Sequence, residues 1–291
     1  MLDYQFPLWR PPSEGDNLIL QATLGCGYNH CSFCSMYKGK GYRARPLDEV
    51  FADMDLAARD WPQAHRVFLA DGDAYGLPAA TLATLCDRLA EKFPGLQRVT
   101  AYATPFNLLR KTPEEMALLK AKRLSLVYLG METGSDLLLR KIAKGSAKQM
   151  EAALLKARAA GLKVSATVIT GLGGKALWRE HMDATADMIN RAPPTYLSTL
   201  QLGLEDEVAP RFFERFGPEF QWQDDRGVLE ELHRLVERLQ PPSPVIFRSN
   251  HASNALALAG TLPKDKGRLL AQLEAALTGQ VGLRPRWLRG L

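Results

Sequence analysis

The chain has 291 residues, 46% of them hydrophobic, with a formal net charge of +5 and four cysteines. This length suits one large core, and no apolar run approaches the ~20 residues that a membrane-spanning helix needs. The N-terminus lacks a basic segment followed by an apolar one, so we expect a cytoplasmic protein without a signal peptide. Three cysteines lie within nine residues, which favours a metal site over a disulfide framework.

Short apolar runs alternate with helical patterns along the chain. Residues 1–17 are rich in proline and predict an irregular arm, in which 10–14 is interpreted as a linker. The predicted strands then cover 18–24, 66–70, 98–103, 124–130, 163–169 and 196–202, with a weaker seventh at 244–248. Residues 206–291 are expected to form a C-terminal extension with helices and this extra strand, packed on a core of residues 18–205.

The intervening helices have recognisable ends. Apolar residues at helical spacing predict a helix over 46–60, and capping boxes at 112–115 and 146–149 predict two more helix starts. Cys86 lies on an apolar helical face and is interpreted as a buried, inert thiol. Strand–helix alternation predicts an α/β fold with right-handed crossovers, in which about six units close partly or wholly into a TIM-like barrel.

The cysteine loop directly follows the first predicted strand. Cys26, Cys31 and Cys34 therefore lie at the carboxyl ends of the strands, where ligands bind in such folds. Three thiolates suit an iron–sulfur cube in which one iron has no protein ligand. The alternative is a zinc ion held by the same cysteines and His30.

This loop resembles that of the radical S-adenosylmethionine (radical SAM) superfamily, although four residues rather than three separate Cys26 from Cys31. The resemblance is to uncharacterised members loosely labelled as relatives of oxygen-independent coproporphyrinogen oxidase. It implies a partial (β/α)6 barrel, a [4Fe–4S] cluster on the three cysteines, and SAM bound to the fourth iron. It also implies reductive cleavage of SAM to a 5′-deoxyadenosyl radical that abstracts hydrogen from a substrate.

The resemblance assigns further residues to SAM. Phe33 occupies the aromatic position before the last cysteine, and Gly72 and Asp73 follow the second strand, where the SAM amino group is received. Glu132 and Ser135 follow the fourth strand, near the ribose or carboxylate of SAM. The backbone that holds adenine is expected at the end of the fifth strand, at Ile169, Thr170 and Gly171.

The expected substrate site is at the last strand. Arg248 and His251 are the candidate catalytic residues, and together with Lys38, Lys40, Arg43 and Arg45 they favour a small anionic substrate. The alternative for 249–254 is a loop that caps a helix at 254–259. Arg284, Arg286 and Arg289 are interpreted as solvated surface, and His65, His181 and His233 are given no role.

Two other functional classes remain open. The basic charge is compatible with an enzyme that modifies tRNA or rRNA, although no RNA-binding module is recognisable. A zinc or electron-transfer protein is the third class. An enzyme of the radical SAM type also implies an electron donor such as flavodoxin or ferredoxin, and no membrane partner is expected.

Overall fold

The computed structural model describes residues 2–290, which divide into two compact units. The first unit contains residues 2–29, 36–129 and 156–164, and the second contains residues 30–35, 130–155 and 165–290. Strands in both units are mostly parallel and alternate with helices, which confirms the predicted α/β class. In this range no helix is both long and apolar enough to cross a membrane. The predicted boundaries at 17 and 205 stay a prediction.

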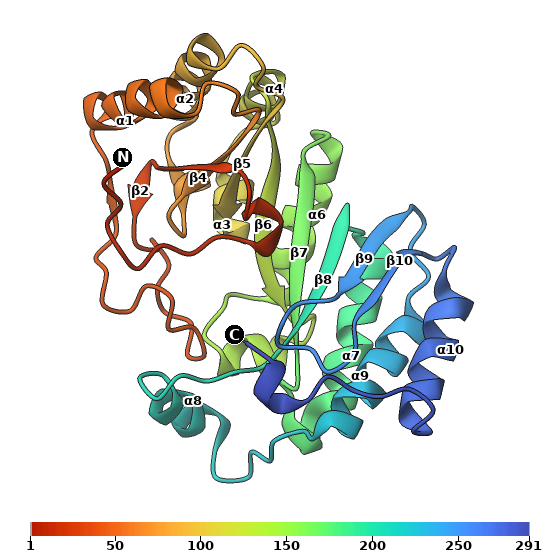
Figure 1. Ribbon diagram of the computed structural model, residues 1–291. Helices are drawn as coiled ribbons and strands as arrows, with labels where there is room; N and C mark the ends of the chain where they lie inside the picture. The colour runs from red at the N-terminus through yellow and green to blue at the C-terminus, as the bar shows by residue number, and fades with distance from the viewer. Residues whose placement is uncertain (1, 291) are drawn as a thin grey trace. The chain divides into compact units, whose positions relative to one another are not determined.

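The first unit is built on parallel strands in the order β1-β4-β5-β6 (Figure 1). They are β1 (Leu18–Gln21), β4 (Arg66–Ala70), β5 (Arg98–Ala103) and β6 (Leu124–Glu132), the last of which continues into the second unit. A short antiparallel pair joins β2 (Thr23–Leu24) to β3 (Arg43–Ala44). The predicted strand 18–24 is therefore divided at Ala22, since its end pairs with β3 rather than with β4.

Helices α1 (Leu47–Asp60), α2 (Ala79–Lys92) and α4 (Pro113–Ala121) pack side by side in this unit, with the short α3 (Pro105–Arg110) after β5. The capping box predicted at α4 is confirmed: Thr112 Oγ1 accepts from the backbone N of Glu115 at 3.2 Å, and Glu115 Oε2 accepts from that of Thr112 at 2.8 Å. Cys86 is buried in α2, and burial raises the pKa of its thiol to about 12.

Residues 10–14 are not a linker, because Glu14 is completely buried in the first unit. Its Oε1 accepts a hydrogen bond from Thr100 Oγ1 at 3.0 Å and a short one from the Tyr128 hydroxyl, while the Arg98 guanidinium lies 3.8 Å away. Strands β5 and β6 supply these partners. A buried carboxylate needs such donors, so this contact fixes the N-terminal arm on the sheet.

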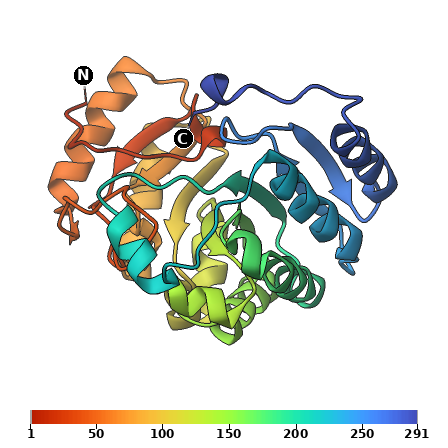
Figure 2. The same cartoon turned by 90° about the horizontal axis from the view of Figure 1, so that it is seen from below.

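In the second unit the strands follow the order β7-β8-β9-β10 (Figure 2). They are β7 (Lys163–Thr170, of which 165–170 belong to this unit), β8 (Tyr196–Gln201), β9 (Val245–Ser249) and β10 (Leu258–Leu262). Strand β9 runs parallel to β8, as predicted for 244–248. The predicted helix at 254–259 is wrong: residues 254–257 form a loop, and Leu258–Leu262 pair antiparallel with β9, because tertiary pairing overrides local helix propensity.

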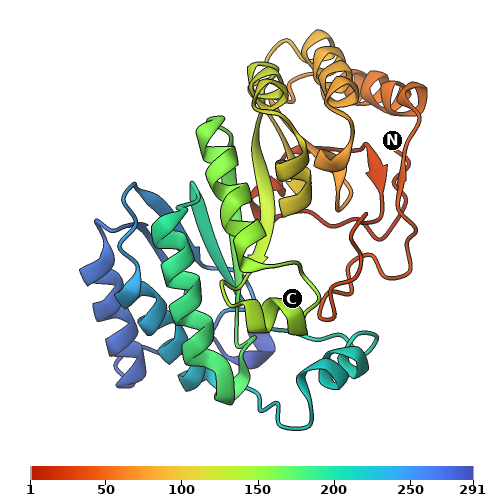
Figure 3. The same ribbon diagram turned by 180° about the vertical axis from the view of Figure 1, so that it is seen from behind.

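The helices of the second unit include α7 (Gly174–Arg191), α9 (Asp225–Arg238) and α10 (Lys266–Leu277), which pack side by side (Figure 3). Two shorter ones, α5 (Asp136–Lys141) and α8 (Ala209–Phe216), contact each other. Helix α6 (Ala147–Ala159) begins in this unit and ends in the first. The backbone N of Gln149 donates to Ser146 Oγ at 3.3 Å, which confirms its predicted cap.

Candidate active site

The cysteine loop starts at a glycine whose conformation and surroundings exclude other residues. Gly25 has φ +67°, and a Cβ there would lie 2.6 Å from the carbonyl oxygen of Lys40. Its backbone N donates to Asp71 Oδ2 at 3.0 Å, and its carbonyl accepts from the backbone N of Gly72 at 3.1 Å. The start of the loop is thus fixed to the segment that follows β4.

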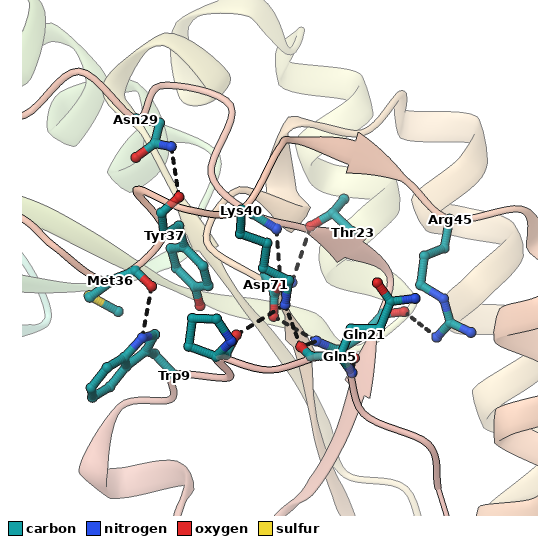
Figure 4. Close-up of polar contacts among 12 residues, drawn as sticks. Gln5, Trp9, Gln21, Thr23, Asn29, Met36, Tyr37, Lys40, Arg45 and Asp71 are labelled. Atoms are coloured by element: carbon teal, nitrogen blue, oxygen red, sulfur yellow. Dashed lines mark hydrogen bonds and ion pairs between the residues drawn. The ribbon is translucent and has the colours of Figure 1, made fainter.

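Asp71 is the centre of this attachment (Figure 4). Its carboxylate is fully buried, forms an ion pair with Lys40 Nζ at 2.6 Å, and accepts a hydrogen bond from Gln21 Nε2 at 3.1 Å. The Gln21 amide in turn exchanges two 2.9 Å hydrogen bonds with the backbone of Gln5. Asp71 therefore holds the loop, β1 and the N-terminal arm together.

Two of the four cations predicted to attract an anion are neutralised within the unit. Lys40 pairs with Asp71, and Arg45 NH1 donates to the Gln21 carbonyl at 3.0 Å (Figure 4). Arg45 NH1 also lies 2.5 Å from Asp53 Oδ2. Lys38 Nζ donates to the carbonyl of Asn29 at 2.8 Å. For Lys40 and Arg45 the prediction of an anion-binding patch is therefore wrong, because both cations form ion pairs with carboxylates of the protein.

Replacing Asp71 with asparagine is expected to destabilise the protein by about 3 kcal/mol, because it leaves the largely buried Lys40 ammonium without its counter-ion. Equilibrium urea unfolding under anaerobic conditions measures this change. The control is Asp60→Asn, which removes a solvent-exposed ion pair with Arg59 and should change the unfolding free energy by less than about 0.5 kcal/mol. Equal effects of the two substitutions would contradict a structural role for Asp71.

Asp73 is different, since one of its buried oxygens lacks a partner. The residue is 7% exposed, and Oδ1 of its side chain has no hydrogen-bond partner among the described residues. Burial raises its pKa to about 6, although a hydrogen bond from Asn107 and the nearby Lys111 lower it. A buried acceptor left unsatisfied is costly, so this carboxylate is suited to receive a donor from a ligand.

Glycines bring the loop against this carboxylate. A Cβ on Gly27 would lie 2.4 Å from Asp73 Oδ2, and one on Gly72 would lie 3.0 Å from the Cβ of Cys26. The structure thus brings Cys26, Gly72 and Asp73 together within the first unit.

Cys31 and Cys34 belong to the second unit, where residues 30–35 contact the end of α5. The backbone N of Ser32 donates to the carbonyl of Ile142 at 3.0 Å, and Ser32 Oγ donates to that of Lys141 at 3.2 Å. Phe33 packs against a buried apolar cluster that includes Leu138, Ile169 and Leu202.

Glu132 lies at the end of β6 with an unusual backbone and a charged partner. Its φ is +63°, its side chain is 7% exposed, and its Oε1 is 2.5 Å from Lys144 Nζ. Burial alone would lower the pKa of Lys144, but the Glu132 carboxylate and the Cys31 and Cys34 thiols raise it above its ordinary value. Lys144, a cation beside two of the cysteines, was not predicted, since no motif marks it.

The segment after Glu132 is held by buried polar contacts. Ser135 Oγ caps α5 by accepting from the backbone N of Leu138 at 3.4 Å, and it donates to Glu180 at 3.0 Å. His181, which was given no role, is fully buried between Thr133 Oγ1 at 2.8 Å and the carbonyl of Ile169 at 2.9 Å. Burial lowers its pKa to about 4, so the imidazole is neutral and joins the ends of β6 and β7.

The predicted adenine segment ends β7. Thr170 Oγ1 donates to the carbonyl of Leu200 at 3.1 Å, and Gly171 has φ +80°. The backbone N of Gly171 donates to Oε2 of Glu231, a fully buried residue of α9, at 2.6 Å. Glu231 was not predictable from the sequence, because an isolated acid on an amphipathic helix is usually solvated.

The loop after β9 places polar groups beside the end of β8. His251 Nδ1 lies 2.8 Å from Ser253 Oγ, which accepts from the backbone N of Gln201 at 3.2 Å. Asn254 Nδ2 donates to the carbonyl of Thr199 at 2.7 Å. Oε1 of Gln201 is buried and has no partner among the described residues. Burial first, and then Arg284, lower the pKa of His251, so this cluster is electrically neutral at pH 7.

Arg248 and the basic tail have structural contacts. The exposed Arg248 donates to the carbonyl of Phe247 at 2.8 Å and to that of Gly260 at 3.3 Å. Arg284 NH1 donates to the carbonyls of His251, Ala252 and Asn254 at 3.0–3.5 Å. Arg289 forms two hydrogen bonds with Asp225, at 2.7 and 2.8 Å. The interpretation of Arg284 and Arg289 as solvated surface is therefore wrong.

Comparison with known families decides the interpretation of this loop. The model of the radical SAM superfamily matches residues 20–189, more than half of the chain. The chain belongs to the radical SAM superfamily. As a member of this superfamily it is an enzyme of the radical SAM class, with a [4Fe–4S] cluster and SAM as its cofactors. No curated protein matches the chain significantly.

Solved radical SAM structures share the fold at low sequence identity. Coproporphyrinogen III oxidase (HemN) from Escherichia coli has a TM-score of 0.56 at 14% identity, covering 76% of this chain and 51% of that one. Methylornithine synthase (PylB) has a TM-score of 0.54 at 15% identity, covering 88% and 68%. TsrM from Kitasatospora setae is a radical SAM methyltransferase solved with cobalamin and a [4Fe–4S] cluster. It has a TM-score of 0.53 at 21% sequence identity, and the match covers 68% of this chain and 39% of TsrM. These likenesses confirm the partial TIM-like barrel class of the fold.

The residues present fit the radical SAM cofactors by their chemistry. No cysteine forms a disulfide within residues 2–290. Thiolates are the ligands that an iron–sulfur cluster requires, and Cys26, Cys31 and Cys34 are the residues that would supply them. In the same range no group of three His, Cys, Asp or Glu side chains lies close enough to hold a single metal ion. When bound, the cluster supplies the electron that cleaves SAM. The buried Asp73 oxygen is an acceptor of the kind that the SAM ammonium needs.

Proposed function

We propose that this radical SAM enzyme removes a hydrogen atom from a small substrate. The observation that carries the proposal is the buried Asp73 carboxylate, whose Oδ1 has no partner among the described residues and whose Oδ2 lies against Gly27 of the cysteine loop. In this proposal Cys26, Cys31 and Cys34 hold the cluster and Asp73 receives the SAM amino group. Glu132 and Ser135 lie toward the ribose or carboxylate, and the backbone of Ile169, Thr170 and Gly171 holds adenine.

The substrate is proposed to bind at the loop after β9. His251 lies beside Ser253, and the nearby Oε1 of Gln201 is a buried acceptor that suits a hydroxyl or amine donor of the substrate. Arg248 remains the proposed contact for a carboxylate or phosphate, since Lys40 and Arg45 are already paired. A flavodoxin or ferredoxin is proposed as the electron donor, in the reducing cytoplasm.

The test is the formation of 5′-deoxyadenosine by anaerobic, dithionite-reduced protein in the presence of SAM. We expect slow release of 5′-deoxyadenosine without substrate, because the residues proposed to hold SAM come from the chain itself. His251→Ala should keep this slow release and the iron content while losing the faster turnover that substrate induces. Absence of 5′-deoxyadenosine from protein that carries the full cluster would refute the proposal.

The alternative is a radical SAM enzyme that modifies RNA, which the charge of +5 favours. Binding of tRNA or rRNA with a steep salt dependence would support this alternative, because each phosphate contact releases counterions. If RNA binds weakly and its binding does not depend on salt, the RNA alternative is contradicted and a small substrate is favoured.

A further inference from the structure

Two buried titratable side chains hold the backbone of 169–171 from opposite ends. His181 Nε2, from α7, donates to the carbonyl of Ile169 at 2.9 Å. Glu231, from α9, accepts from the backbone N of Gly171 at 2.6 Å. Both side chains have no exposed surface. Because the neutral imidazole can donate at only one nitrogen, Nε2 carries the hydrogen and Nδ1 accepts from the Thr133 hydroxyl.

A buried carboxylate at Glu231 has a large desolvation cost, which its two hydrogen bonds only partly offset. Its second oxygen accepts from Gln223 Nε2 at 3.0 Å, so both partners of the carboxylate are neutral amides. Burial raises the pKa of Glu231 to about 7, although the Gly171 and Gln223 hydrogen bonds lower it. A neutral side chain would satisfy the Gly171 N–H at a lower desolvation cost, whereas a carboxylate binds it more strongly.

The connection that leads into α9 also braces the turn after β7. The carbonyl of Gln221 accepts from the backbone N of Lys175 at 2.9 Å. A Cβ on Gly174, which has φ +54°, would lie 2.7 Å from that carbonyl oxygen. Residues 221–231 thus contact the turn at both Gly171 and Gly174, so movement of α9 would displace the backbone at the end of β7.

We propose that Glu231 is a positioning residue for SAM, which fixes the Gly171 backbone and so the edge that receives adenine. The inference rests on the proposed function, which places adenine at Ile169–Gly171. Glu231 itself does not touch SAM in this arrangement. Its effect is transmitted through one backbone N–H.

The test compares wild type with Glu231→Gln, measuring SAM affinity of the anaerobic holoenzyme at pH 6 and pH 8. Glutamine has nearly the same shape as glutamate, and its amide oxygen still accepts from the backbone N of Gly171. Its NH2 group can donate to the oxygen of the Gln223 amide once that amide is flipped. We expect SAM to bind about fivefold more weakly to the variant at pH 8, because the charge-assisted bond is lost. The difference should shrink at pH 6, where wild-type Glu231 is itself protonated. Asp73 titrates near the same range in both proteins, so the comparison isolates Glu231.

The same substitution should raise the thermal stability of the protein at pH 8, although it weakens SAM binding there. A carboxyl group with a raised folded-state pKa loses stability as pH rises from its unfolded value to about 7. Glutamine carries no such cost, so the Tm of Glu231→Gln should rise by about 3 °C at pH 8 and change little at pH 5. A purely structural role predicts instead a lower Tm together with weaker binding, and that result would overturn the inference.

Two controls separate the possible failures. Glu230→Gln alters a more exposed carboxylate of the same helix and should change neither SAM affinity nor its pH profile. Gly171→Ala keeps the N–H but strains a backbone at φ +80°, and should weaken SAM binding. If Gly171→Ala weakens binding and Glu231→Gln does not, the positioning role is refuted and the proposed function stands. If neither variant changes binding, adenine does not lie at this segment and both proposals fail there.

Discussion

Replacing Cys26, Cys31 or Cys34 individually with alanine is expected to remove the iron–sulfur cluster. Anaerobically purified wild-type protein should contain about four irons and four sulfides per chain and absorb broadly in the visible range. Each variant should fall to near zero, because the cluster then has only two protein ligands. Iron and sulfide analysis together with the visible spectrum measures the loss.

Cys86→Ala is the matched control for these variants. Its thiol is buried in α2, and burial raises its pKa to about 12, so it is neither a thiolate nor accessible to iron. The control should therefore keep the full iron content. Retention of iron by any of the three loop variants would contradict the assigned ligands, as would tightly bound zinc without sulfide in the wild type.

Asp73→Asn is expected to weaken SAM binding by about thirtyfold while the iron content stays unchanged. The asparagine keeps the shape of the side chain but removes the charge that would pair with the SAM ammonium, a change worth about 2 kcal/mol. Glu132→Ala should also weaken binding, since it removes the carboxylate beside Lys144. Equilibrium binding of SAM to the anaerobic holoenzyme measures both effects.

The pH dependence gives this prediction a second observable. The pKa of Asp73 is about 6, and only the ionised carboxylate attracts an ammonium group. Wild-type SAM affinity should therefore decrease as the pH falls through 6, and Asp73→Asn should lose that component of the decrease. Asp87→Asn, at an exposed carboxylate of α2 that pairs with Lys122, is the control and should behave as wild type. A variant at Asp73 with wild-type affinity at pH 8 would place the SAM amino group elsewhere.

The sequence predicted the strand boundaries correctly where burial on both faces of the sheet produces a continuous apolar run. The predictions for 66–70 and 98–103 match β4 and β5 at both ends, because a parallel strand covered on both faces has a nearly continuous apolar sequence. The alternating Ala and Leu residues at 254–259 suit a helix equally well, and only pairing with β9 selects a strand for Leu258–Leu262. Short apolar runs of this kind are ambiguous without their neighbours.

The charged residues of the site were less predictable. The cysteine loop and Asp73 could be proposed for the site from the sequence, because each follows the end of a predicted strand. The sequence does not reveal that Lys40 and Arg45 are paired, since their partners Asp71 and Asp53 belong to other elements. Glu14, Lys144 and Glu231 are single charged residues in ordinary surroundings, and only the tertiary structure reveals their burial and their partners.

The contact between Arg284 and the loop after β9 determines which positions of this protein can change their sequence during evolution. One guanidinium donates to the carbonyls of His251, Ala252 and Asn254, so it recognises the shape of the loop and not its side chains. The loop residues are therefore able to vary in identity as long as their backbone keeps its course, whereas Arg284 is not replaceable by a residue with fewer donors. Among relatives of this chain, we expect new substrate preferences to arise at 250–254 while position 284 remains arginine.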